Sequence, residues 1–297
     1  MLKIEKIAIV GVGLIGGSVA LRLKQADAVG EVIGVGRSRA SLNEAMGLGV
    51  IDRVLDLTEA AALADCILIA TPVRQMPEIF SAIAPHLREH ALVMDAGSTK
   101  QDVVAAARLQ LGRKISQFVP AHPIAGREMS GVAAADALLF ENKKVVLTPL
   151  TENSPAFVAT AAALWRACGA QVSTMSAESH DAIFAAVSHL PHILAFALVD
   201  EFAARPNAKT LFSFAASGFR DFTRIAGSSP EMWRDIALNN RAALLAEMDA
   251  YLIKAAQLRA LISRADAPQL EALMQRSHDA KALWLAGELD YFRDESV

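Results

Sequence analysis

A glycine-rich turn near the start of the chain constrains the fold more than any other feature. The apolar run K-I-A-I-V, typical of a buried strand, passes directly into G-V-G-L-I-G. Gly11 permits a tight turn, Gly13 lets the backbone approach a pyrophosphate, and Gly16 permits close packing of the next helix on the strand. The N–H groups at the start of that helix, at Leu14 and Ile15, are free to bind phosphate. The pattern therefore predicts a dinucleotide-binding α/β unit.

The first 175 residues alternate short apolar runs with helical patterns. The runs that we interpret as strands are 5–10, 31–35, 65–70, 91–95, 117–121, 144–148 and 171–175. The helical patterns between them are 14–26, 38–47, 74–87, 99–110 and 155–168. Continuous apolar strands that alternate with helices favour a doubly wound, mostly parallel sheet of the Rossmann type. We therefore expect an α/β dinucleotide-binding domain over residues 1–175.

The strand signal disappears after about residue 176. Helical periodicity covers residues 177–204, 230–263 and 268–291, where Ala, Leu, Glu and Arg dominate. Stretches such as 243–253 are apolar over more than one stripe, and such a helix needs a further partner. The pattern predicts an all-helical domain over residues 176–297 that serves dimerisation, so we expect a homodimer.

Composition excludes several classes of function. A net charge of −3 points neither to nucleic acid nor to an anionic membrane surface. No uninterrupted apolar stretch approaches the ~20 residues that a membrane span needs, and no signal core precedes the first strand. The only cysteines, Cys66 and Cys168, lie in apolar surroundings and are interpreted as buried, reduced thiols. We expect a cytoplasmic protein with no nucleic-acid or membrane partner.

The end of the second predicted strand bears on the choice of cofactor. An NAD site usually places Asp or Glu there to bind the ribose hydroxyls, but this chain has Gly36 followed by Arg37 and Ser38. These side chains can hydrogen-bond a 2′-phosphate, and Arg37 adds positive charge. We expect NADP, with NAD still possible. Thr71 and Pro72, which end the next strong strand, are candidate contacts for the nicotinamide ribose.

Four polar motifs remain beyond the glycine loop. D-A-G-S-T-K at 95–100 and H-P-I-A-G-R-E at 122–128 follow predicted strands, so both are expected at the sheet edge that binds the nicotinamide. S-H-L-P-H at 188–192 and D-F-T-R at 221–224 belong to the helical half. A cleft between the two halves would bring all four together. No metal ligand set has a suitable spacing, so no metal is expected.

Taken together, these motifs resemble the prephenate/arogenate (cyclohexadienyl) dehydrogenase family. The resemblance covers nearly the whole chain, and its specificity comes from several independent motifs in order. It implies that His122 helps to remove the proton of the substrate's ring hydroxyl and that Ser98 binds near that hydroxyl and orients His122. It further implies that substrate-binding residues line the pocket: Arg224 for a carboxylate, His192, Ser188 and Trp233 with Met232 from the helical half, and Glu128 at the entrance.

The implied reaction is the oxidative decarboxylation of arogenate or prephenate in tyrosine biosynthesis, and the residue types suit it. A neutral His can accept the hydroxyl proton because its ordinary pKa lies near 6.5, and an Arg offers a planar fork to a carboxylate. The preferred substrate stays open, as does the choice between Arg220 and Arg224. Tyrosine is a possible inhibitor, expected to compete at the active site.

Two other functions compete with this interpretation. One is a different two-domain NADP oxidoreductase, of the β-hydroxyacid dehydrogenase or imine reductase type, although no matching lysine motif stands in the helical half. The other is a non-catalytic NADP-binding sensor. Of the remaining histidines, His86, His90, His180 and His278 are interpreted as surface or structural, and one member of the pair His189 and His192 is expected only to pack or cap.

Overall fold

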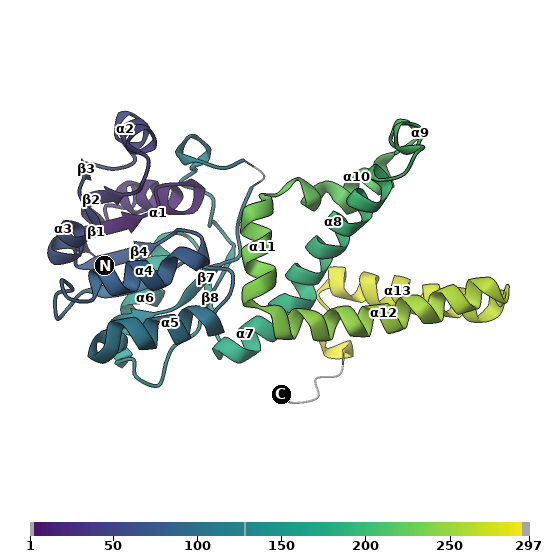
Figure 1. The fold of residues 1–297 in the computed structure, drawn as a ribbon. Helices are drawn as coiled ribbons and strands as arrows, with labels where there is room; N and C mark the ends of the chain where they lie inside the picture. Colours follow the sequence, from purple (N-terminus) through teal and green to yellow (C-terminus); the bar gives the residue numbers. More distant parts are fainter. Residues whose placement is uncertain (1–2, 128, 293–297) are drawn as a thin grey trace. The chain divides into compact units, whose positions relative to one another are not determined.

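A six-stranded parallel sheet frames the first 120 residues, and its strand order is β3-β2-β1-β4-β5-β6 (Figure 1). Every neighbouring pair in it runs parallel. The strands are β1 Ile4–Val10, β2 Val29–Val35, β3 Arg53–Val54, β4 Cys66–Ile69, β5 Leu92–Asp95 and β6 Phe118–Val119. The order reverses between β1 and β4, so the carboxyl ends of these two strands flank the crevice where such sheets bind ligands.

Helices cover both faces of this sheet, because alternate strand side chains point to opposite faces. In β1, Ile7 and Ile9 join one core and Ala8 and Val10 join the other. Helices α1 and α6 supply the first core, and α3, α4 and α5 supply the second. The helices of this part are α1 Leu14–Gln25, α2 Arg39–Gly47, α3 Leu57–Leu63, α4 Met76–Ile83, α5 Gln101–Leu111 and α6 Pro155–Ala167. The predicted doubly wound arrangement is confirmed.

A second, three-stranded sheet contains His122, and the sequence analysis did not separate it from the first. The expected strand 117–121 ends at Pro120, which has no N–H for a ladder, and the chain then forms β7 Ala121–Pro123. Strand β7 pairs antiparallel with β8 Lys144–Leu147, which in turn pairs parallel with β9 Gln171–Thr174. The strands expected at 144–148 and 171–175 therefore exist but belong to this second sheet.

The described residues after β9 are mostly helical, as expected. Its helices are α7 Ala177–Phe184, α8 Leu190–Ala203, α9 Ala208–Ser213, α10 Ser217–Thr223, α11 Pro230–Asn239, α12 Arg241–Ser263 and α13 Ala267–Ala286. Short 3₁₀ turns occur at Val73–Gln75, Gly112–Gln117, Val132–Ala134, Arg224–Gly227 and Leu289–Tyr291. A π-helical turn, Ala185–His189, joins α7 to α8. The helical pattern expected over 230–263 is interrupted at Asn240, the C-cap of α11.

This computed structural model describes residues 3–127 and 129–292 and divides into two compact units, Met1–Leu244 and Leu245–Val297. The expected domain boundary at residue 175 falls inside the first unit, so it stays a prediction. All the side-chain contacts described below lie within the first unit. In the second unit, α12 leaves large apolar side chains exposed; Leu252 is 58% and Ile253 62% exposed.

One helical run among the described residues, Ala177–Ala203, is long and apolar enough to cross a membrane by length and composition, with a mean hydropathy of 1.9. The sequence analysis expected no such stretch, because His189, Pro191 and Asp200 interrupt the apolar residues. The structure joins α7, the π turn and α8 into one continuous run. The same run contributes His180 and Asp181 to the hydrogen-bonded cluster described below.

Candidate active site

The glycine loop is shaped by close contacts at two of its three glycines. Gly11 has φ +96°, and a Cβ there would lie 2.7 Å from the Ala70 carbonyl oxygen. A Cβ on Gly16 would overlap the carbonyl oxygen of Gly11 and a methyl group of Ile9. Gly13 differs, because a Cβ there would meet nothing within 4 Å. The space in front of Gly13 is therefore open to a ligand, as the expected approach of a pyrophosphate requires.

The residues around this loop also fit a dinucleotide. The first helical N–H groups, at Leu14 and Ile15, face the turn without intrahelical partners. Thr71, which follows β4, has a buried Oγ1 with no hydrogen-bond partner among the described residues, and such an atom is usually satisfied by a ligand or water. The neighbouring Pro72 is exposed. These features support binding of the cofactor at the carboxyl edge of β1 and β4.

The exposed turn after β2 carries the residues expected to select the cofactor. Gly36 and Arg37 are exposed. Ser38 is the N-cap of α2, and its Oγ accepts a hydrogen bond from the Ser41 N–H at 3.2 Å. The positive end of the α2 dipole and the Arg37 guanidinium therefore lie next to each other in the chain, a combination that favours an anion.

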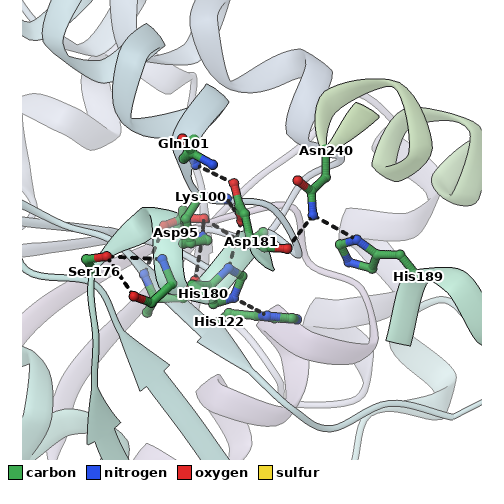
Figure 2. A network of polar contacts seen from close by, with 12 residues as sticks. Asp95, Lys100, Gln101, His122, Ser176, His180, Asp181, His189 and Asn240 are labelled. Atoms are coloured by element: carbon green, nitrogen blue, oxygen red, sulfur yellow. Dashed lines mark hydrogen bonds and ion pairs between the residues drawn. The ribbon is translucent and has the colours of Figure 1, made fainter. Parts of the chain in front are cut away.

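A buried ion pair holds the D-A-G-S-T-K loop against the strand of the catalytic candidate. The side chains of Asp95 and Lys100 are fully buried and bond to each other. Lys100 Nζ also donates to the Ala121 carbonyl oxygen at 2.8 Å, and the Ala121 N–H donates to Asp95 Oδ1 at 3.0 Å. The pair therefore fastens the loop that carries Ser98 to β7, the strand that carries His122 (Figure 2).

His122 is held by a chain of hydrogen bonds that ends on a carboxylate. His122 Nδ1 lies 2.8 Å from His180 Nε2, and His180 Nδ1 lies 2.8 Å from Asp181 Oδ1. The Asp181 carboxylate also accepts the backbone N–H groups of Lys100 and Gln101, each at 2.9 Å, at the start of α5. Figure 2 shows this chain running from β7 through α7 to α5.

Burial sets the protonation of this chain. The pKa of His122 lies well below its ordinary value, mainly because burial penalises the charged ring and also because His180 and Lys100 stand nearby. Burial likewise lowers the pKa of His180, although the bond to Asp181 opposes the shift. For Asp181, burial raises the pKa, but bonds from His180 and two backbone N–H groups outweigh it and leave the pKa lowered. Neutral histidines beside an ionised carboxylate result.

The π turn and α8 bring a second histidine group against Trp233. The indole is 6% exposed and stacks on His192 with ring centroids 3.6 Å apart. His192 Nδ1 lies 2.8 Å from the carbonyl oxygen of Ser188, one turn earlier. The charge of Arg224 contributes to lowering the pKa of His192, although burial is the larger cause. The structure thus brings four predicted residues of the helical half into one region.

Some expected contacts differ in the structure. Ser98 is half-buried but makes no hydrogen bond to His122 among the described residues; His180 orients the ring instead. Of the two interpretations of His180, surface or structural, the first is wrong, because the ring is fully buried and hydrogen-bonded to His122. Met232 is 41% exposed, unlike the neighbouring Trp233. Glu128 lies outside the described residues.

Sequence reasoning missed Asp181 and Asn240 as members of this cluster. The only signal for Asp181 was its position directly after a histidine, eleven residues before His192. His122 and His180 are 58 residues apart in the chain, and Asn240 is 51 residues from His189, which it contacts. No local pattern predicts pairings across such separations.

Two family models match the chain in succession. Residues 19–174 match the nucleotide-binding domain of prephenate dehydrogenase. Residues 176–276 match the dimerization domain of prephenate dehydrogenase.

Individual proteins match over nearly the whole chain. A prephenate dehydrogenase of Bacillus subtilis is 39% identical over 93% of this chain and 75% of its own length. A cyclohexadienyl dehydrogenase of Zymomonas mobilis is 34% identical over 95% of this chain and 96% of its own. The crystal structure of an A. aeolicus prephenate dehydrogenase, in complex with hydroxyphenyl propionate and NAD+, aligns with a TM-score of 0.88 and 35% identity over 95% of this chain and 98% of that one. With both domain models matched in order, the chain belongs to the prephenate dehydrogenase family.

Proposed function

We propose that this protein catalyses the oxidative decarboxylation of prephenate or arogenate in tyrosine biosynthesis, and that it works in the cytoplasm. The observation that carries the proposal is the state of His122: a neutral ring whose Nδ1 is occupied by His180. Its Nε2 has no hydrogen-bond partner among the described residues. The names of the related enzymes support the same reaction.

The substrate's chemistry asks for a proton acceptor at the ring hydroxyl. Prephenate is a cyclohexadienol that carries a ring carboxylate and a pyruvyl side chain, and arogenate carries an alanyl side chain instead. His122 Nε2 accepts the hydroxyl proton as the carbon–oxygen double bond forms. A bound nicotinamide dinucleotide would supply the hydride acceptor. Loss of carbon dioxide follows because it makes the ring aromatic, so no nucleophile of the protein has to attack the substrate.

Arg224 is proposed to hold the side-chain carboxylate of the substrate. Its charge already acts on His192, and His192 stacks on Trp233, so the three side chains form one candidate wall of the pocket. The ring carboxylate must leave as neutral carbon dioxide, so a strong ion pair to that group would stabilise the ground state and slow the reaction. We therefore assign Arg224 to the other carboxylate and expect Ser188 and Ser98 to contact the substrate less strongly.

We further propose that the cofactor is NADP, with NAD as a weaker alternative. The proposal is supported by Gly36 at the position of the usual acidic residue and by the exposed Arg37 beside Ser38 at the start of α2. The related A. aeolicus enzyme was crystallised with NAD+, so the preference has to be measured. Gly11, Gly13, Leu14, Ile15 and Gly16 would hold the pyrophosphate.

The working form is proposed to be a homodimer, because the second half matches a dimerization domain and α12 exposes apolar side chains. Sedimentation velocity would show a single species of twice the chain mass, and a monomer at enzyme-assay concentrations would contradict the proposal. Tyrosine is proposed to inhibit by competing with the substrate for the same pocket.

One assay tests the reaction itself. The purified protein is incubated with prephenate or arogenate and with NADP or NAD, and reduced nicotinamide and carbon dioxide are measured together. We expect both products in equal amounts with at least one substrate, and a rate about 10²- to 10⁴-fold lower with His122→Asn. Absence of both products with every pair would exclude the reaction and favour a different oxidoreductase or a non-catalytic NADP-binding protein. A signal of reduced nicotinamide without carbon dioxide would contradict the decarboxylation.

A further inference from the structure

Asp181 contacts the histidine cluster through two different groups, its carboxylate and its backbone carbonyl. We propose that Asp181 is a positioning residue that holds two histidines in opposite tautomers: His122 with a bare Nε2 and His189 with a protonated Nε2. The proposal deepens the proposed function, on which its catalytic meaning rests. The tautomers themselves follow from the hydrogen bonds of neutral rings and do not depend on the reaction.

The carboxylate determines the tautomer of His122. An ionised carboxylate can only accept, so His180 Nδ1, 2.8 Å from Asp181 Oδ1, must carry a proton. A neutral His180 then has a bare Nε2, which can only accept. The His122 Nδ1 that lies 2.8 Å from it must therefore be the donor. A neutral His122 with a protonated Nδ1 has a bare Nε2, which is the form that can accept a substrate proton.

The backbone carbonyl determines the tautomer of His189. The Asn240 side-chain atom 2.7 Å from the Asp181 carbonyl oxygen must be its nitrogen, because a carbonyl oxygen only accepts. The same nitrogen lies 3.1 Å from His189 Nδ1, so that ring nitrogen is the acceptor and is bare. In a neutral ring the proton is then on Nε2. The Asn240 amide is thus oriented with its nitrogen towards both Asp181 and His189, and Figure 2 shows it bridging these two residues.

Both tautomers require neutral rings, and the surroundings of His180 and His189 keep these rings neutral. His180 is fully buried and faces Lys100 as well as the carboxylates of Asp181 and Asp95, and its pKa is lowered. His189 is 1% exposed, and burial together with the neighbouring His180 and His192 lowers its pKa to about 4 even though Asp181 opposes the shift. Neither ring is charged near neutral pH.

The opposite tautomers of His122 and His189 leave one ring nitrogen of the cluster, His122 Nε2, able to act as a base. The bare nitrogens of His180 and His189 are occupied by hydrogen bonds, whereas His122 Nε2 has no partner within residues 3–127 and 129–292. When His122 Nε2 takes the hydroxyl proton, the new positive charge lies on a ring whose Nδ1–H already points to His180. That proton can shift to His180 Nε2, which leaves His122 neutral and places the charge beside the Asp181 carboxylate. This proton shift from His122 to His180 thus stabilises the protonated state without a direct contact between Asp181 and the substrate.

The tautomers can be measured without any substrate. In protein labelled with ¹⁵N at histidine, the ring nitrogen shifts distinguish protonated from bare nitrogens, and His122→Asn and His189→Asn variants assign the two rings. We expect a bare Nε2 on His122 and a bare Nδ1 on His189 in the unaltered protein. The same tautomer in both rings, or a protonated Nε2 on His122, would overturn the proposal.

Two variants separate the two arms. Asp181→Ala removes the acceptor of the His180 Nδ1–H, so His180 and His122 are expected to lose their single tautomers, while His189, held through Asn240 and the backbone carbonyl, stays unchanged. Asn240→Leu removes the amide that donates to His189 Nδ1, so His189 is expected to lose its single tautomer while His122 stays unchanged. An unchanged His122 spectrum in folded Asp181→Ala would overturn the proposal. Should either variant fail to fold, the spectrum of the unaltered protein still decides.

Steady-state kinetics test the role of Asp181 in the reaction. Asp181→Ala is expected to lower kcat by about 10²- to 10⁴-fold, the range of a lost general base, with KM and cofactor affinity nearly unchanged. Asp102→Ala is the matched control, because Asp102 lies in the first turn of α5 and has no hydrogen bond to a histidine of the cluster among the described residues, and its kcat should stay within about twofold. Equal kcat in the two variants would overturn the catalytic role. If the unaltered protein oxidises neither substrate yet shows opposite tautomers, the proposed reaction fails and the tautomer assignment stands.

Discussion

The glycine loop and the histidine cluster lie in the same compact unit but are built in opposite ways. The loop is encoded within six residues, and its shape follows from backbone sterics at Gly11 and Gly16. The cluster collects side chains from β7, α7, the π turn and Asn240, and its shape follows from hydrogen bonds between residues more than 50 positions apart. The loop is therefore sensitive to an added methyl group, whereas the cluster is sensitive to a displaced proton.

The comparison also separates binding from chemistry. Loop residues offer backbone N–H groups and open space, which suit a large ligand held by many weak contacts. Cluster residues are linked by hydrogen bonds, and their histidines are neutral beside the ionised Asp181, which suits a single proton transfer. Substitutions in one region should therefore leave the function of the other nearly intact, and the following predictions test that independence.

Loss of the proposed base should have the largest effect. His122→Asn removes the proton acceptor, so kcat should fall by about 10²- to 10⁴-fold. Binding of the dinucleotide, measured by fluorescence titration, should stay within about twofold because no loop residue changes. Turnover close to that of the unaltered protein would refute the role of His122, and a parallel loss of cofactor binding would show that the two regions are not independent.

The folded protein should lose stability as the pH falls below about 6.5, because His189 is buried in its neutral form. The pKa of His189 is near 6.5 in an unfolded chain and about 4 in the folded protein, so the unfolded state binds more protons between these values. The contribution of neutral His189 to the free energy of unfolding is therefore fully present above pH 6.5. It is lost as the pH falls towards about 4, and the loss amounts to roughly 3 kcal/mol. Urea unfolding at several pH values should show a smaller loss in His189→Gln, and equal losses in both proteins would contradict the assignment.

Two alanine substitutions should separate the packing role of Gly16 from the ligand-binding role of Gly13. Gly16→Ala forces a Cβ into the Gly11 carbonyl, so it should lower the free energy of unfolding by about 1–3 kcal/mol. Gly13→Ala meets no protein atom, so stability should be unchanged while cofactor affinity falls by about tenfold, or roughly 1.4 kcal/mol. Thermal unfolding and cofactor titration measure the two effects. Unchanged affinity in Gly13→Ala would place the pyrophosphate elsewhere.

The smallest effect is expected at the exposed end of the loop region. Arg37→Ala should lower the ratio of NADP to NAD efficiency by about tenfold, since one charged hydrogen bond to the 2′-phosphate is lost. Arg113→Ala, which removes an equally exposed arginine from the 3₁₀ turn before β6, is the control and should leave the ratio unchanged. If Arg37→Ala also leaves the ratio unchanged, the proposed NADP preference loses its structural support.

The sequence patterns predicted individual strands and helices better than they predicted which of these contact one another. Each expected strand exists, because runs such as C-I-L-I and L-V-M-D are apolar enough to be buried on both faces. The separation of β7, β8 and β9 into a second sheet was not predictable, since the sequence has no marker for which strand pairs with which. The contact between His180 and His122 was missed for a related reason, because the neighbours of His180 along the chain do not reveal it.

By itself the sequence determined the dinucleotide loop, the parallel α/β order, the helical second half and the family resemblance, because these depend on residues close together in the chain. Only the tertiary structure decided which group orients His122, since that requires β7, α7 and α5 to pack against one another. The physical reason lies in the nature of the interactions. Steric and hydrophobic patterns repeat locally, whereas a tautomer depends on the particular donor or acceptor that folding brings within about 3 Å.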